Sequence, residues 1–213
     1  MREFLKRITY TIIAVIAIIS LQSCSNENAD KNLREGKILF EAKNFKSALD
    51  KFSKAVNDGN DETKAQAYYQ RALTKEQLDD AKGAVNDYSE ALKINKNDYE
   101  SWHNRGILKD NLRDHNGAIS DYTQAIALNG NRYEAFLNRG VAYSNLSKKR
   151  EAMLDFENAL RRNPKFARAW YFLALTKHDL NDTTACRDAK NAVVLGLPEA
   201  SEFLKENCGK VVN

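Results

Sequence analysis

The feature that most constrains this chain is a repeat of about 34 residues that fills most of its length. Small residues recur at spacings of 36, 34, 34 and 34: Gly36, Ala72, Gly106, Gly140 and Ala174. Alanines recur at spacings of 36, 34, 34 and 33: Ala48, Ala84, Ala118, Ala152 and Ala185. Aromatic residues follow four positions after the first four of these alanines: Phe52, Tyr88, Tyr122 and Phe156. A period of this length indicates stacked copies of one supersecondary unit.

Each copy carries a small residue on a first helix and an Ala-x3-aromatic-x2-Ala ridge on a second, and small residues let two antiparallel helices approach closely. This pattern resembles the tetratricopeptide repeat, over residues 29–199. The resemblance implies an all-α fold, a right-handed α-solenoid of about five helix-turn-helix units. No strand pattern competes with it.

The expected repeats are 29–64, 65–98, 99–132, 133–166 and 167–198, in a repeat domain of residues 32–207. Two extra residues fall near Asp58-Gly59-Asn60, where a turn can absorb them. A last helix over 198–207 is expected to cap repeat five, because a solenoid needs its terminal edge covered.

The amino terminus has the layout of a secretory signal. Residues 1–7 are basic, and the apolar residues 8–21 that follow are fewer than the roughly 20 that a membrane span needs. Leu21-Gln22-Ser23-Cys24 resembles the lipobox of bacterial lipoproteins. The resemblance implies that residues 1–23 are a signal peptide, that Cys24 is acylated, for instance with palmitate, and that residues 24–31 are a polar tether. An uncleaved single-span anchor is the alternative.

The expected location is the bacterial cell envelope, as a lipid-anchored protein of the outer membrane that faces the periplasm. The outer membrane is favoured because Ser25, and not an aspartate, follows Cys24. Cleavage before Cys24 lowers the net charge from +4 to +2, because the removed segment carries three basic residues and one acidic residue. Basic residues form no concentrated stripe, so a nucleic-acid partner is not expected.

The sequence holds no pattern of catalytic chemistry. His103, His115 and His178 have no partner at metal-ligand spacing, and no phosphate loop or nucleophile motif is present. An enzyme, a metal, a cofactor and a small-molecule substrate are therefore not expected.

Charges pair at the seventh and twenty-third positions of the repeats, as Arg71 with Asp87, Arg105 with Asp121 and Arg139 with Asp155. Repeat one has the reversed pair Glu35 and Lys51, which favours a structural role over ligand binding. As exposed pairs they would contribute at most about 1 kcal/mol each. In repeat five Leu173 replaces the basic residue and leaves Asp188 over.

The resemblance also implies a partner-binding groove on the concave face, formed by the second, fifth, ninth and twelfth residues of each first helix. The fifth and ninth positions predict these groove residues: Leu33, Tyr69, His103, Leu137, Tyr171, Leu73 and Ile107. Alternatively, the ninth-position aliphatic residues pack against the neighbouring repeat. Asp110 and Arg168 stand at twelfth and second positions. Leu33 and Lys37 replace the residues with which some family members grip a terminal carboxylate, so that mode is not expected.

Cys186 and Cys208 are expected to form a disulfide. Cys186 lies ten residues before Gly196 and Cys208 eleven after Leu197, so antiparallel helices bring both to the same end. Secretion would supply an oxidising compartment. Two buried thiols are the alternative.

The predicted function is an envelope-anchored scaffold or adaptor that binds a segment of a protein partner. The alternatives are a peptidoglycan- or glycan-binding envelope protein and a subunit of an outer-membrane assembly or secretion complex. The sequence does not identify the partner.

Overall fold

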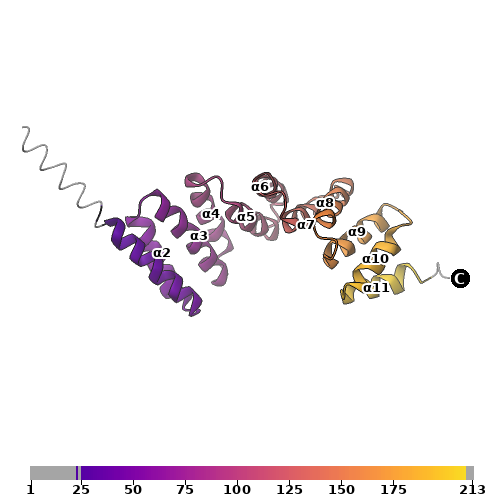
Figure 1. Ribbon diagram of the computed structural model, residues 1–213, viewed down its shortest axis with the longest axis horizontal. Helices are drawn as coiled ribbons and strands as arrows, with labels where there is room; N and C mark the ends of the chain where they lie inside the picture. Colours follow the sequence, from indigo (N-terminus) through magenta and orange to yellow (C-terminus); the bar gives the residue numbers. More distant parts are fainter. Residues whose placement is uncertain (1–22, 24, 210–213) are drawn as a thin grey trace, which may run out of the picture. The chain divides into compact units, whose positions relative to one another are not determined.

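The computed structural model describes residue 23 and residues 25–209, which form helices and turns without a strand (Figure 1). The chain divides into unit 1, Met1–Lys96, and unit 2, Asn97–Asn213. Unit 1 contains a first helix over residues 25–41, followed by α2 (Phe45–Asp58), α3 (Asp61–Gln77) and α4 (Ala81–Ile94). Unit 2 contains α5 (Tyr99–Asn111), α6 (His115–Leu128), α7 (Tyr133–Asn145), α8 (Lys149–Arg162), α9 (Ala167–Asp179), α10 (Ala185–Val194) and α11 (Pro198–Asn207). Within each unit consecutive helices pack on one another, as in an α-solenoid.

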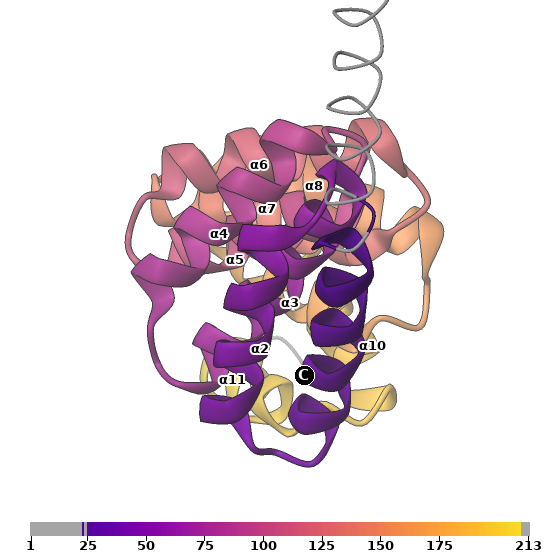
Figure 2. The same ribbon diagram turned by 90° about the vertical axis from the view of Figure 1, so that its left-hand side faces the viewer.

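The core of repeats one to four is an aromatic ring packed against a small residue of the partner helix. Phe52, Tyr88, Tyr122 and Phe156 are at most 1% exposed. A Cβ atom added at Gly140 would lie 2.6 Å from Cε1 of Phe156, and one at Gly36 2.5 Å from Cε1 of Phe52. Figure 2 shows the first helix and α2 side by side. A larger side chain at Gly36 would overlap the Phe52 ring. The small residue therefore sets the distance between the two helices of a repeat.

The turn inside each repeat has the same backbone conformation. Its fifteenth residue is left-handed, with φ between 57° and 64°, in all five copies: Lys43, Asp79, Arg113, Ser147 and Asn181. The N–H of the next residue donates to a carbonyl five residues earlier, as from Asp114 to Lys109 at 2.8 Å. This satisfies a carbonyl at the helix end that would otherwise lack a partner. Asp114 also accepts a hydrogen bond from the N–H of Gly117 at 3.0 Å and so begins α6.

The two extra residues between repeats one and two lengthen a helix instead of a turn. Asn60 caps α3 by accepting from the N–H of Thr63 at 2.9 Å, so α3 begins at Asp61. Only residues 59 and 60 separate α2 from α3.

The expected tether over residues 24–31 is corrected by the structure, because residues 25–31 belong to the first helix. Ala29 is fully buried. The Ser25 hydroxyl donates to the Asp58 carbonyl at 2.7 Å, and the Thr63 hydroxyl donates to Asp30 Oδ1 at 2.6 Å. Because residues 25–31 are mostly polar, the sequence did not predict that they form a helix that packs against repeats one and two. The expected signal peptide and Cys24 lie outside the described residues, apart from Ser23.

Repeat five completes its core differently from the others. Ala189 stands where the other second helices carry an aromatic ring, and it packs with Ala174, Phe203 and Cys208. Phe203 lies on α11, so the last helix supplies the ring that α10 lacks. Cys186 and Cys208 are joined by a disulfide with their Cα atoms 5.8 Å apart, which ties α11 to α10.

In repeats two to four the aspartates of the charge pairs are buried, contrary to the expectation that the pairs lie exposed. The Glu35 and Lys51 side chains of repeat one are 36% and 30% exposed. Asp87, Asp121 and Asp155 are at most 3% exposed. Arg71 and Arg139 each form two hydrogen bonds to their carboxylate, at 2.7–2.8 Å, and these bonds raise the pKa of both guanidinium groups. Removing one partner of a buried pair leaves an uncompensated charge and costs about 3–5 kcal/mol.

Asp188 is not left over in repeat five, which corrects the sequence-based interpretation. Lys177, one helical turn after Leu173, places Nζ 2.6 Å from Asp188 Oδ2. Lys75 and Lys109 occupy the same position in repeats two and three and lie 2.8 and 2.9 Å from Asp87 and Asp121. A second cation one turn later therefore replaces the missing arginine.

Arg139→Leu is expected to lower the free energy of unfolding by about 3–5 kcal/mol, measured by urea denaturation, because Asp155 loses its cation. Arg105→Leu is the matched control, since Lys109 still faces Asp121, and it should cost clearly less. Equal losses would contradict the role assigned to the second cation.

Gly140→Val is expected to lower the free energy of unfolding by about 1–3 kcal/mol, because the added atoms overlap the Phe156 ring. In the double variant Gly140→Val with Phe156→Leu, the smaller leucine side chain should recover part of the lost stability. Gly130→Ala is the control, because its Cβ would meet nothing closer than the Ile126 carbonyl oxygen at 3.4 Å. A tolerated Gly140→Val would show that the helix spacing is not set by this contact.

Candidate partner-binding groove

Unit 2 contains a groove of about 370 Å³ between the first helices of repeats three, four and five. Its lining comes from α5, α6, α7 and α9: Ile107, Asp110, Asn111, Tyr122, Asn138, Val141, Arg168 and Phe172. We call it the α5–α7–α9 groove. First helices line most of the groove. In repeats three and four the contact between a glycine and an aromatic ring packs one face of the first helix against the second helix and leaves the opposite face open.

The groove combines an apolar wall with charges of both signs. Ile107 and Val141 are half-buried ninth-position residues, and they also pack against the core, as the alternative interpretation of this position expected. Asp110 stands on α5 and Arg168 on α9. Arg168 is exposed, and its guanidinium carbon lies 6.0 Å from the centroid of the Phe172 ring. The groove is therefore suited to a ligand with both apolar and charged groups.

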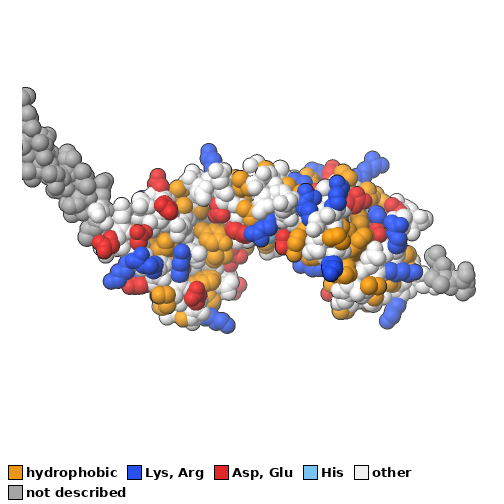
Figure 3. All heavy atoms as spheres, viewed as in Figure 1, with side chains coloured by type: hydrophobic (Ala, Val, Ile, Leu, Met, Phe, Trp, Pro, Cys, Tyr) orange, Lys and Arg blue, Asp and Glu red, His pale blue; other side chains and the backbone are white. Residues whose placement is uncertain are grey.

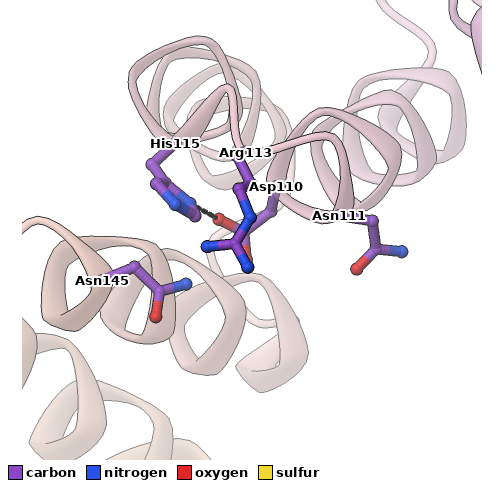
Figure 4. Close-up of a pocket in the computed structure, with 5 residues that line it drawn as sticks. All are labelled: Asp110, Asn111, Arg113, His115 and Asn145. Atoms are coloured by element: carbon purple, nitrogen blue, oxygen red, sulfur yellow. Dashed lines mark hydrogen bonds and ion pairs between the residues drawn. The ribbon is translucent and has the colours of Figure 1, made fainter.

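Asp110 is held by a histidine from the next helix. His115 Nδ1 lies 2.6 Å from Asp110 Oδ1, and both side chains are about 15% exposed. Figure 4 shows the two side chains pointing toward one another, with Asn145 on the neighbouring helix α7. These residues line a second cavity of about 330 Å³, which shares Asp110 and Asn111 with the groove. Asp110 therefore faces the groove from a fixed position.

Asn138 is oriented by His103. Its Nδ2 lies 3.1 Å from His103 Nε2, and burial lowers the pKa of the imidazole. The lowered pKa favours the neutral ring, and in its Nδ1-protonated tautomer Nε2 accepts from the amide of Asn138. Burial also raises the pKa of Tyr122, whose hydroxyl stays protonated.

The predicted fifth-position rings pack on other aromatic rings, which lie in the same repeat for Tyr69 and His103 and on the capping helix α11 for Tyr171. Ring centroids lie 5.8 Å apart for Tyr69 and Tyr88, and 5.8 Å apart for His103 and Tyr122. Tyr171 lies 6.5 Å from Phe203. Tyr69, His103 and Tyr171 are half-buried, so they support the core as well as facing outward.

Leu33 and Leu137 are corrected from groove residues to core residues. Leu137 is 2% exposed and packs with Phe156 and Leu173, and Leu33 is 6% exposed and packs with Phe52. A flexible aliphatic side chain turns into the core at a position where a ring with a polar end stays partly outside. Tyr69 and Leu73 belong to unit 1 and do not line the α5–α7–α9 groove. Of the seven predicted groove residues, Ile107 lines it.

Sequence reasoning missed Tyr122, Phe172 and Asn138 as groove residues. Tyr122 has the periodicity of the core ridge, and its edge reaches the groove although it is 1% exposed. Asn138 occupies the sixth position of its repeat, and its contact with His103 crosses from one repeat to the next. Only the stacking of repeats three and four brings Asn138 close to His103.

Neither a metal-binding cluster nor a membrane-spanning helix is found in the described part of the chain. Among residues 23 and 25–209 no group of three or more His, Cys, Asp or Glu side chains could hold a metal ion. No helix within that part of the chain is long and apolar enough to cross a membrane. On the face in Figure 3, Lys and Arg side chains are interspersed with Asp and Glu and form no continuous stripe.

Residues 65–98, 99–132 and 133–166 each match the tetratricopeptide repeat family. These three segments have the tetratricopeptide repeat pattern. The limits of these three repeats agree with those expected from the spacing of the alanines and glycines. A search of curated proteins finds no match to the sequence.

Solved structures of tetratricopeptide repeat proteins share the fold. YrrB, described as a TPR protein with an unusual peptide-binding site, has 21% identity and a TM-score of 0.75, over 84% of this chain and 93% of its own. MamA from Desulfovibrio magneticus has 15% identity and a TM-score of 0.74, over 80% and 96%. Pseudomonas aeruginosa PilF has 20% identity and a TM-score of 0.66, over 85% and 86%. At these identities the similarity shows the fold alone.

Proposed function

We propose that this protein is a scaffold or adaptor that binds a segment of a protein partner in the α5–α7–α9 groove. The observation that carries the proposal is the groove itself, which combines an apolar wall with Asp110, Asn138 and Arg168. Such a mixture suits a peptide, whose backbone needs hydrogen bonds and whose side chains need apolar contacts. The peptide-binding site of YrrB, which has the same fold, supports this choice of ligand class.

The solenoid also supports this placement of the binding surface. Consecutive first helices present equivalent positions to one ligand, which the second helices with their buried ridge do not. The remaining exposed apolar side chains, such as Leu154 on α8 at 55%, do not line this groove. A partner that binds in the groove would therefore contact three repeats at once.

Arg168→Glu is expected to lower recovery of the partner from envelope extracts at least about fivefold, a loss of about 1 kcal/mol. Arg168 forms no ion pair with a described residue, so the helical content and Tm should not change. Arg150→Glu makes the same charge reversal at an exposed position of α8 and should leave recovery intact. Loss of recovery with Arg150→Glu alone would place the binding surface elsewhere.

We further propose that the protein is anchored in the bacterial envelope through lipid on Cys24, in the outer membrane. The support is the sequence Leu21-Gln22-Ser23-Cys24 after an apolar stretch with a basic start. Ser25 already belongs to the first helix and is bonded to Asp58. Lipid on Cys24 would therefore hold the repeat domain directly at the membrane surface, without a flexible tether. Two or more acyl chains suffice for stable anchoring.

Cells that express the chain and are fed alkyne-tagged palmitate are expected to label the wild type and the Cys208→Ser variant. Cys24→Ala should lose the label and keep the unprocessed mass, because the acylated thiol is absent. Equal labelling of Cys24→Ala, or no labelling of the wild type, would exclude the anchor.

A further inference from the structure

The α5–α7–α9 groove carries opposite charges on its two outer helices, which gives it a direction. Asp110 stands on α5 and Arg168 on α9, and α7 packs against both of these helices. A segment that crosses α7 therefore meets a carboxylate at one side and a guanidinium at the other. Directional binding deepens the proposed function of this groove and rests on it.

Asp110 offers one carboxylate oxygen to a ligand. His115 Nδ1 lies 2.6 Å from Oδ1, and among the described residues Oδ2 has no hydrogen-bond partner. The side chain is 15% exposed. A cation that reaches this oxygen is partly shielded from water, which strengthens the attraction relative to an open surface. The histidine keeps the carboxylate from turning away, because it holds the other oxygen (Figure 4).

The guanidinium group of Arg168 is available to bind a ligand. It lies at the exposed edge of the groove and forms no ion pair within the described part of unit 2. Its contact with the Phe172 ring, at 6.0 Å, supports the side chain without occupying its N–H donors. A guanidinium with free donors binds a carboxylate through two parallel hydrogen bonds.

Between the two charges α7 supplies an apolar contact and a hydrogen-bond acceptor. Val141 of α7 and Ile107 of α5 line the groove together. Because Asn138 Nδ2 points at His103, its Oδ1 is left to accept from a peptide N–H. The volume of about 370 Å³ falls within the range of about 300–1,000 Å³ seen for ligand pockets.

We propose that the groove binds its partner segment in one register and one direction. A Lys or Arg side chain of the partner lies at Asp110, an apolar side chain lies against Ile107 and Val141, and an Asp or Glu carboxylate lies at Arg168. The order of charges, cation toward α5 and anion toward α9, is what distinguishes this segment from one with the same composition reversed.

The test is selection of random peptides displayed on phage against the purified full chain in detergent. The wild type should enrich peptides with a cationic and an acidic residue on either side of an apolar one. The double swap Asp110→Arg with Arg168→Asp should enrich the reversed charge order. Glu151→Gln, on α8 outside the groove, should enrich the same peptides as the wild type.

A synthetic copy of a selected peptide then isolates the contact at Asp110. Replacing its Lys by norleucine keeps the aliphatic stem and removes the charge, and should weaken binding about tenfold. In the Asp110→Asn variant the same replacement should have no further effect, which shows that the two changes remove one interaction. This comparison does not depend on the fold of the swapped variant.

The outcomes separate the directional binding from the proposed function. The directional binding would be overturned by enriched peptides that lack the charge order, or that bind the Asp110→Asn variant as they bind the wild type. If these peptides no longer bind the Val141→Arg variant, the groove would still be supported as the site. Enrichment of no peptide, or of peptides that bind Val141→Arg equally well, would overturn both.

Discussion

The contact between a small residue on the first helix of a repeat and an aromatic ring on the second is the interaction on which the rest of the structure depends. Phe156 against Gly140 is the tightest example in unit 2, and it leaves no space for a Cβ atom. The contact brings the helices of one repeat so close that the seventh-position arginine and the twenty-third-position aspartate meet away from water. A pair of this kind would contribute little on the surface, whereas here the buried aspartate would be left without a compensating charge if its arginine were removed.

The same contact also creates the α5–α7–α9 groove. When one face of α5 and of α7 is drawn against the second helices, the opposite faces are left in a row that α9 extends. Ile107, Val141 and Arg168 lie on those faces, and the stacking of repeats brings Asn138 to His103. The groove is therefore a consequence of repeating the core, and its charges come from positions at which the repeats differ, Asp110 and Arg168.

Much of the fold could be predicted from the sequence, because Ala, Gly and aromatic residues recur with a period that tertiary context does not disturb. The groove could be predicted only in part, since position numbers do not tell which way a side chain turns. Leu137 turns into the core at the position where His103 stays partly outside. Lys177 reaches Asp188 from a position one turn away from the expected one. The start of the first helix, over residues 25–31, could not be predicted because Ala29 is the only buried residue in this segment.

We propose that this protein meets its partner on the open face of α5, α7 and α9. The most direct measurement is photo-crosslinking in intact cells, with a photoreactive amino acid placed at Val141 in the groove or at Leu154 on the exposed surface of α8. A partner that binds in the groove should give a defined crosslinked species from position 141 and none from position 154. A crosslinked partner at position 154, with none at position 141, would contradict the proposal.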